Sequence, residues 1–139
     1  MAYSAYAGSF NIDSSVTAGN DQSVTGVGFQ GKVVLFWWSG GTSAGDEVAG
    51  GTIRYGFGAA ASSSSRWYTS CYSVDGAAAS DTSATSNTDA CIGIIASPAS
   101  IDGEADFKQW DADGFTLTID DQFTADYRIS FLPRGRRPH

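Results

Sequence analysis

The longest apolar run in this chain is the six-residue stretch 33–38, Val-Val-Leu-Phe-Trp-Trp, which follows Lys32. β-Branched and aromatic residues dominate it, and glycines lie on both sides. A short, continuous run of this kind is typical of a strand buried on both faces. It is far shorter than the roughly 20 residues that a helix needs to cross a bilayer. The run therefore predicts a central strand and no membrane-spanning segment.

Alternating apolar and polar residues predict the other strands. They fall at residues 9–12, 22–29, 52–59, 66–74, 90–96, 101–110, 115–119 and 127–132. The second apolar run, 90–96, is expected to pair with the central strand, whereas 39–51 and 75–89, which lack large apolar clusters, are expected to be exposed loops. Asp113-Gly114 between alternating stretches is a strong hairpin signal. About eight or nine strands and no convincing helix predict an all-β fold, an antiparallel two-sheet sandwich of jelly-roll type.

The length and charge of the chain limit its organisation and partners. Its 139 residues suit one domain, which we place at 1–132, followed by a basic C-terminal tail at 133–139. The net charge of −7 argues against a nucleic-acid partner. The tail reverses this sign with Arg134, Arg136 and Arg137, and it also contains His139, the only histidine. It is either a solvated extension or an arm that docks on an acidic neighbour, most simply another copy of the chain.

Residues 1–8 and the two cysteines bear on the cellular compartment. The N-terminal stretch has no basic residue and no apolar core of the kind that a secretory signal needs, so export by that route is not expected. In a reducing cytosol, Cys71 and Cys91 are expected to be two buried thiols rather than a disulfide. Their spacing does not match a structural zinc site.

No catalytic set stands out among the titratable residues. The only histidine lies in the predicted tail, which argues against a serine or cysteine hydrolase. Glycosidases need two facing carboxylates, but alternation places Glu104 and Asp106 on one polar strand face with Lys108. Asp111 and Asp113 resemble the opening of a calcium loop without its third ligand, its final glutamate or its helices. A shared calcium ion there is the alternative to a plain turn, and neither a metal nor a cofactor is predicted.

Four aromatic residues could form a binding surface. Amphipathic rings stack on sugars, and Trp67, Tyr68, Tyr72 and Trp110 are of the right type. The favoured interpretation is that such rings, together with Trp37 and Trp38, fill the core or a subunit interface. Trp67 and Trp110 are therefore candidate partner-binding residues, with Arg134, Arg136 and Arg137.

Two parts of the sequence resemble small virion structural proteins of tailed bacteriophages. They are Gly-Phe-Gln-Gly-Lys-Val-Val-Leu-Phe-Trp at 28–37, and Asp-Gly-Phe-Thr-Leu-Thr-Ile at 113–119 together with Tyr-Arg-Ile-Ser-Phe-Leu at 127–132. Similar proteins carry a Gly-Phe-Gln-Pro-Lys entry into an apolar strand, a closing Gly-Phe-Thr strand and a Tyr-Leu-Ala-Leu-Gly-like ending. This chain departs from them at Gly31, where proline is usual, and at Pro133-Arg134 in the ending.

This resemblance implies a virion β-sandwich and supplies no catalytic residue. It leads us to expect a capsid decoration (cement) protein, assembled in the cytoplasm of the bacterial host. Such a protein would be a homotrimer that bridges neighbouring subunits of the major capsid protein. The closing pattern also looks similar to the H-type lectin domain, which forms sugar-binding trimers. That similarity implies the alternative of a carbohydrate-binding module on a tail fibre or spike, used for host attachment.

Overall fold

Two antiparallel sheets form the structure, a computed structural model that describes residues 3–48, 50–76, 81–97 and 100–136. Within these residues there are twelve strands and no helix. The strands are β1 (Tyr3–Ala5), β2 (Gly8–Asn11), β3 (Asp21–Val24), β4 (Val33–Trp38), β5 (Thr52–Ile53), β6 (Gly56–Ser62), β7 (Ser65–Val74), β8 (Thr82–Asn87), β9 (Ile92–Ser97), β10 (Ser100–Asp111), β11 (Gly114–Asp121) and β12 (Arg128–Arg136). The predicted all-β, two-sheet antiparallel fold is confirmed.

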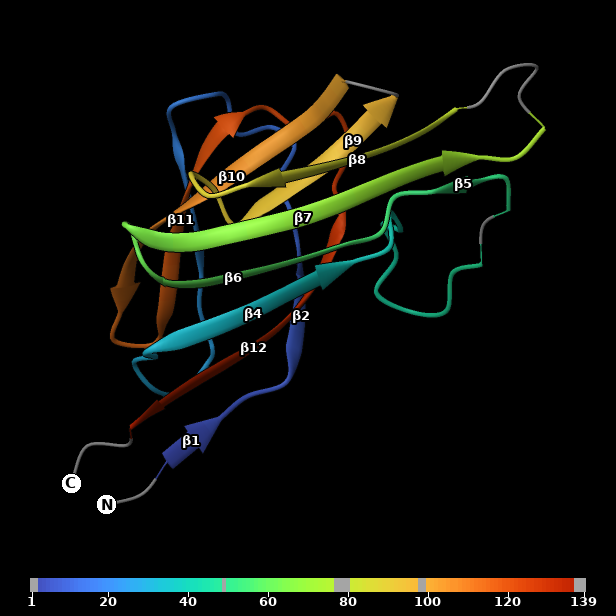
Figure 1. Cartoon of the computed structure of the whole chain (residues 1–139). Helices are drawn as coiled ribbons and strands as arrows, with labels where there is room; N and C mark the ends of the chain where they lie inside the picture. The colour runs from blue at the N-terminus through green and yellow to red at the C-terminus, as the bar shows by residue number, and fades with distance from the viewer. Residues whose placement is uncertain (1–2, 49, 77–80, 98–99, 137–139) are drawn as a thin grey trace.

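The first and last strands of the chain, β1 and β12, lie side by side in one sheet, which we call sheet A (Figure 1). Sheet A has eight strands in the order β1-β12-β4-β6-β7-β5, and β2 also pairs with β12 while β8 pairs with β7. Sheet B has four strands in the order β3-β11-β10-β9. The last two strands lie against the first ones, because β12 lies between β2 and β4, and β11 pairs with β3. Strands β4, β6 and β7 are successive neighbours in sheet A, β5 and β8 both pair with β7, and β9, β10 and β11 are successive neighbours in sheet B.

The predictions for the strand 90–96 and for the loop 75–89 need correction. The apolar strand β9 does not pair with β4, since it lies in sheet B and pairs with β10. Strand β8 lies inside the predicted loop 75–89, in a stretch of small and polar residues without a large apolar one. It pairs with β7 over six residue pairs. The backbone hydrogen bonds of this pairing stabilise the strand although its sequence has a low strand propensity and no apolar alternation.

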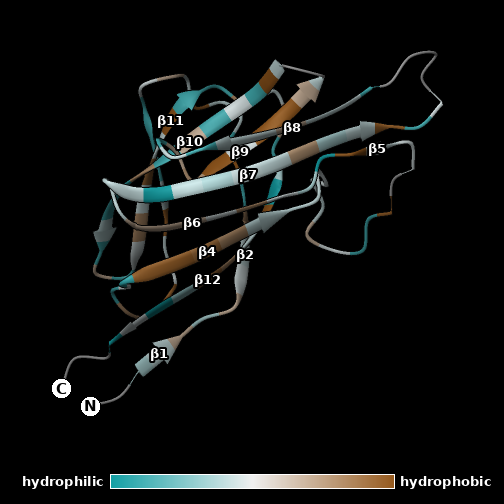
Figure 2. Cartoon of the chain, viewed as in Figure 1, coloured by the Kyte–Doolittle hydropathy of each residue, from teal (hydrophilic) through white to brown (hydrophobic). Residues whose placement is uncertain are grey.

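The core lies between the sheets and takes only one face of β4. Val34, Phe36 and Trp38 are buried, whereas the alternate residues Val33, Leu35 and Trp37 face the other way and keep partial exposure. In Figure 2, β4 is nevertheless hydrophobic along most of its length. The prediction that this strand is buried on both faces is therefore wrong for the single chain, and an apolar strand face remains on its surface.

Glycines make room for large rings in this core. A Cβ atom on Gly56 would lie 2.4 Å from the ring of Trp38, and one on Gly93 would lie 2.2 Å from the ring of Tyr68. Each ring therefore occupies the space that a side chain would fill. This packing explains how a sequence rich in glycine also accommodates bulky aromatic side chains in its interior.

Asp113 fastens the connection from β3 to β4. Its side chain accepts hydrogen bonds from the backbone N–H groups of Gly26 at 3.0 Å and Gly28 at 2.6 Å. Both glycines have positive φ, at 84° and 90°, which other residues rarely adopt. The predicted strand 22–29 therefore ends at Val24. After it the chain turns, and the Asp113 carboxylate binds the N–H groups of Gly26 and Gly28 in this turn.

Replacing Asp113 by alanine should lower the free energy of unfolding by about 1–2 kcal/mol, because two backbone donors lose a charged acceptor. Urea denaturation followed by circular dichroism measures this. Asp121→Ala, at the exposed end of β11, is the control and should change stability by less than about 0.5 kcal/mol. Equal stability of the two variants would show that the loop is held by other contacts.

The last strand continues past the predicted end of the domain. β12 reaches Arg136 and pairs with β1 in the register Ala5–Arg134 to Tyr3–Arg136. Pro133 is tolerated because it lies opposite the break between β2 and β1, where its carbonyl accepts a hydrogen bond from the N–H of Tyr6 at 3.2 Å. The boundary at residue 132 is therefore wrong, and 133–136 belong to the sandwich. Arg137 and His139 lie outside the described residues.

Candidate functional site

The outer face of sheet A, which is turned away from sheet B, carries a broad apolar surface. Cross-strand register aligns Leu132, Leu35, Ala59 and Trp67 in one row of β12, β4, β6 and β7. The next row consists of Ser130, Trp37, Phe57, Thr69 and Ser86. Trp67 is 42% exposed, and its ring centroid lies 5.8 Å from that of Phe57. The other large apolar residues of the two rows are partly exposed, and apolar side chains that gather on a surface can mark an interaction site.

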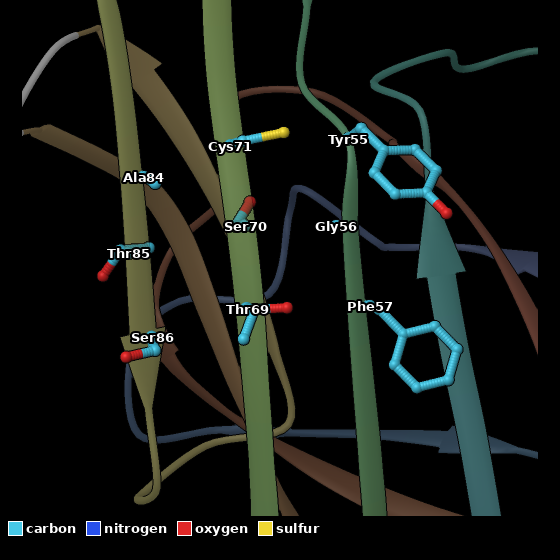
Figure 3. Close-up of a pocket in the computed structure, with 9 residues that line it drawn as sticks. All are labelled: Tyr55, Gly56, Phe57, Thr69, Ser70, Cys71, Ala84, Thr85 and Ser86. Carbon is cyan, nitrogen blue, oxygen red and sulfur yellow. The ribbon is translucent and has the colours of Figure 1, made fainter.

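A shallow groove of about 400 Å³ crosses this outer face beside Phe57 (Figure 3). Its walls come from residues 55–57, from Thr69–Cys71 of β7 and from Ala84–Ser86 of β8. In Figure 3 the rings of Tyr55 and Phe57 and the side chain of Cys71 lie together on one side of the sheet. The groove offers apolar contact area and a few hydroxyl groups, which suits packing against another protein surface.

A second groove, of about 520 Å³, lies at one end of sheet A and is basic. We call it the basic groove, and its lining residues are Tyr3, Lys32, Val33, Arg134, Gly135 and Arg136. The guanidinium carbons of Arg134 and Arg136 lie 5.7 and 5.9 Å from the centroid of the Tyr3 ring, within the range of cation–π attraction. The structure thus brings together two of the predicted arginines.

Lys32 and Tyr3 were not predicted for this site. They join it because β1 and β4 both pair with the end of β12, although these segments are far apart in the sequence. No local signal in the sequence indicates this pairing. It follows only from the order of strands in sheet A.

The predicted aromatic set does not form one platform. Trp67 is exposed, but Tyr68 and Tyr72 are buried on the opposite face of β7. The Tyr68 hydroxyl donates a hydrogen bond to Glu104 Oε2 at 2.7 Å. Burial, followed by the interaction with the Glu104 carboxylate, raises the pKa of Tyr68.

Trp110 was predicted to bind a partner, and in the structure it packs against the core and keeps only partial exposure. The ladder between β10 and β11 shifts register between Phe107 and Gln109, and Trp110 then faces the same side as Phe107. Its Nε1–H donates to the carbonyl of Ala61 at 2.9 Å, and a Cβ atom on Gly31 would lie 2.3 Å from its ring. Strict alternation would have placed it outside, so the bulge decides its position.

The carboxylates of β10 have structural partners. Asp106 forms an ion pair with Arg66 at 2.8 Å, and Glu104 accepts hydrogen bonds from Tyr68 and from Asn87 Nδ2. The hydrogen bond to Asp106 raises the pKa of Arg66. These contacts connect β7 and β8 to sheet B and give Glu104 and Asp106 a structural role.

The Asp111–Gly114 turn closes the hairpin of β10 and β11. Asp111 accepts hydrogen bonds from Gln109 Nε2 at 2.8 Å and from the Thr116 hydroxyl at 2.6 Å, while Asp113 binds the N–H groups described above. In the part of the chain that the structure describes, no group of three or more His, Cys, Asp or Glu residues could hold a metal ion, and no helix could span a membrane.

Both cysteines are free, in different environments. Cys91 is buried, and burial raises the pKa of its thiol. Cys71 is exposed on the outer face of sheet A, so the prediction of two buried thiols is wrong for this residue. The error arises because β7 buries only one of its faces.

A thiol reagent should therefore modify Cys71 at neutral pH and leave Cys91 untouched in the folded protein. Mass spectrometry after brief treatment with iodoacetamide should show one label, and Cys71→Ser should remove it. Addition of denaturant should expose the second site. Two labels in the native protein would contradict the burial of Cys91.

Comparison of the chain with protein-family models, with curated proteins and with solved structures finds no match.

Proposed function

We propose that this chain is a non-enzymatic structural protein of a bacteriophage particle, a decoration (cement) protein that forms homotrimers and bridges subunits of the head. The similarity of residues 28–37 and 113–119 to phage virion proteins suggests this class. The observation that carries the proposal is the apolar outer face of sheet A, because an assembly protein needs a surface of this kind and an isolated soluble module does not.

The sequence of β4 explains why that face requires a partner. Val33, Leu35 and Trp37 are as apolar as the residues on the buried side of the strand, yet the chain itself supplies only one covering layer. Aromatic residues such as Trp67 and Phe57 next to them are typical of the centre of a protein interface. A neighbouring subunit would provide the second layer.

The carbohydrate-binding alternative receives less support from the site. Sugar platforms need exposed rings that lie together, and of the four predicted rings only Trp67 is exposed. A glycan array separates the two functions. The decoration function predicts no selective hit, and a selective hit that Trp67→Ala removes would favour the lectin-like module.

The direct test is the position of the chain in an intact particle, determined by electron cryomicroscopy. We expect trimers on the outside of the head, and we expect heads without the protein to release their DNA at a lower temperature. Adding purified protein back should restore heat resistance. Monomers in the particle, or heads of unchanged stability without the protein, would contradict the proposal.

A further inference from the structure

We infer that the basic groove binds the acidic loop segment 46–48 of a second copy of this chain. This inference rests on the proposed assembly into oligomers and names one of its contacts. It starts from a difference between the basic residues of the protein. Some of them form hydrogen bonds or ion pairs within the chain, and those in the basic groove contact only the ring of Tyr3.

Four basic residues outside the groove have partners within the chain. Arg66 pairs with Asp106, and Lys108 pairs with Asp21 at 2.5 Å. Arg54 donates to the carbonyl of Ile95 at 3.1 Å. The fourth, Arg128, donates to the side chains of Ser9 and Asn11. The positive charges of these residues are therefore used inside the fold.

The three basic residues of the groove differ from these four. The side chains of Lys32, Arg134 and Arg136 are exposed and form no hydrogen bond or ion pair with any other residue that the structure describes. They converge from β12 and from the residue before β4 around the ring of Tyr3, which is 67% exposed. Three unpaired cations beside an exposed ring and Val33 form a site for a partner that is both anionic and apolar.

The chain carries a segment of matching chemistry. Asp46, Glu47 and Val48 follow one another in the loop after β4, and all three are exposed. Val48 is 100% exposed, and the Asp46 carboxylate has no hydrogen-bond partner among the described residues, whereas Glu47 accepts from the N–H of Thr42. The two carboxylates match the cations of the groove, and the valine matches the apolar surface of Val33 and Tyr3.

The positions of loop and groove require contact between different copies. The groove lies where β4 begins, and the loop lies where β4 ends, at the opposite end of sheet A from β1 (Figure 1). The loop of one copy can therefore enter only the groove of another. Contacts between two different surfaces generate rings when the rotation closes, as a trimer requires.

Exposed ion pairs contribute little individually, so the expected effect is moderate. Two to three pairs together correspond to about a tenfold change in the association constant. The contact should also weaken as salt screens the charges. It would orient subunits whose affinity comes mainly from the apolar outer face.

Charge reversal provides the test, with association measured by sedimentation equilibrium at low salt. The groove variant combines Arg134→Glu and Arg136→Glu, and the loop variant combines Asp46→Lys and Glu47→Lys. Each should weaken self-association about tenfold, and the chain that carries all four changes should regain most of it. Asp121→Lys, an acid-to-base change on sheet B, should have no effect beyond the overall charge. Circular dichroism verifies that each variant is folded.

The possible outcomes separate this contact from the proposed function. Weakening by the groove variant without recovery in the combined chain would overturn the assignment of the loop. Unchanged association in all charge variants, with dissociation by Trp67→Arg, would overturn the inference and leave the assembly proposal intact. If the wild type is monomeric, a synthetic peptide of residues 42–48 is titrated against isotope-labelled protein. If the wild-type peptide shifts the resonances of Tyr3 and Val33 and the Asp46→Lys peptide does not, the result supports the site. If the wild-type peptide causes no such shifts, the result refutes it.

Discussion

Replacing Phe115 by alanine is expected to lower the free energy of unfolding by about 3–5 kcal/mol, the range for large aromatic residues in a core. Phe115 is fully buried at the centre of the aromatic core. Its ring lies within 6.3 Å, centroid to centroid, of five others, those of Phe10, Phe36, Phe107, Trp110 and Phe131. These rings come from both sheets, so the substitution opens a cavity where the sheets meet. Urea denaturation of the purified protein measures the loss.

The same substitution at Phe57 provides a matched control. Phe57 lies on the outer face of sheet A and is only partly buried, so Phe57→Ala should cost about 1 kcal/mol or less in the isolated chain. The difference between the two phenylalanines follows from which side of the sheet each one faces. Equal losses at both positions would contradict the one-sided core of the structure.

Replacing Trp67 by arginine is expected to weaken self-association by about 30-fold or more. Central aromatic residues of interfaces typically contribute 2 kcal/mol or more, which corresponds to about that factor. The arginine also places a charge in the surface that the partner would cover. Because Trp67 is exposed in the single chain, the free energy of unfolding at dilute concentration should change little. Analytical ultracentrifugation and urea denaturation of the same sample measure both quantities.

Gln109→Arg supplies the control for this variant. Gln109 is exposed on β10 of sheet B, so the added charge should not affect association. If Trp67→Arg associates as strongly as the wild type, the interface lies elsewhere. If both variants dissociate, the effect is one of overall charge rather than of the outer face.

Local features of the sequence were sufficient to predict several elements of the fold. The hairpin of β10 and β11 follows from Asp113-Gly114 between alternating stretches, and these residues are neighbours in the chain. The irregular segment after β4 follows from its glycines. Strand β4 itself could be predicted because a run of six consecutive apolar residues, rich in β-branched and aromatic types, is typical of a strand. In each case the physical cause, a turn preference or a strand-length apolar run, is contained within about ten residues.

Features that depend on pairing between distant segments could not be predicted in the same way. The polar strand β8 forms because its backbone pairs with that of β7. Strand β12 continues past Pro133 because this residue, which lacks an N–H group, lies opposite the break between β2 and β1, where the ladder needs no donor. Trp110 faces the core because one register shift inverts the alternation. In each case the deciding partner is another strand rather than the neighbouring residues in the sequence.

The candidate site shows the same division. The sequence by itself determined that the chain forms an all-β sandwich, that it is acidic, and that a cluster of C-terminal arginines and several apolar strands are available for contacts. Only the tertiary structure decided which apolar residues remain outside, since Trp67 and Tyr68 are adjacent yet lie on opposite faces of β7. Only the strand order placed Lys32 and Tyr3 beside Arg134 and Arg136. The reason is physical: burial and charge clustering depend on which segments meet in space, and that depends on the pairing of the whole chain.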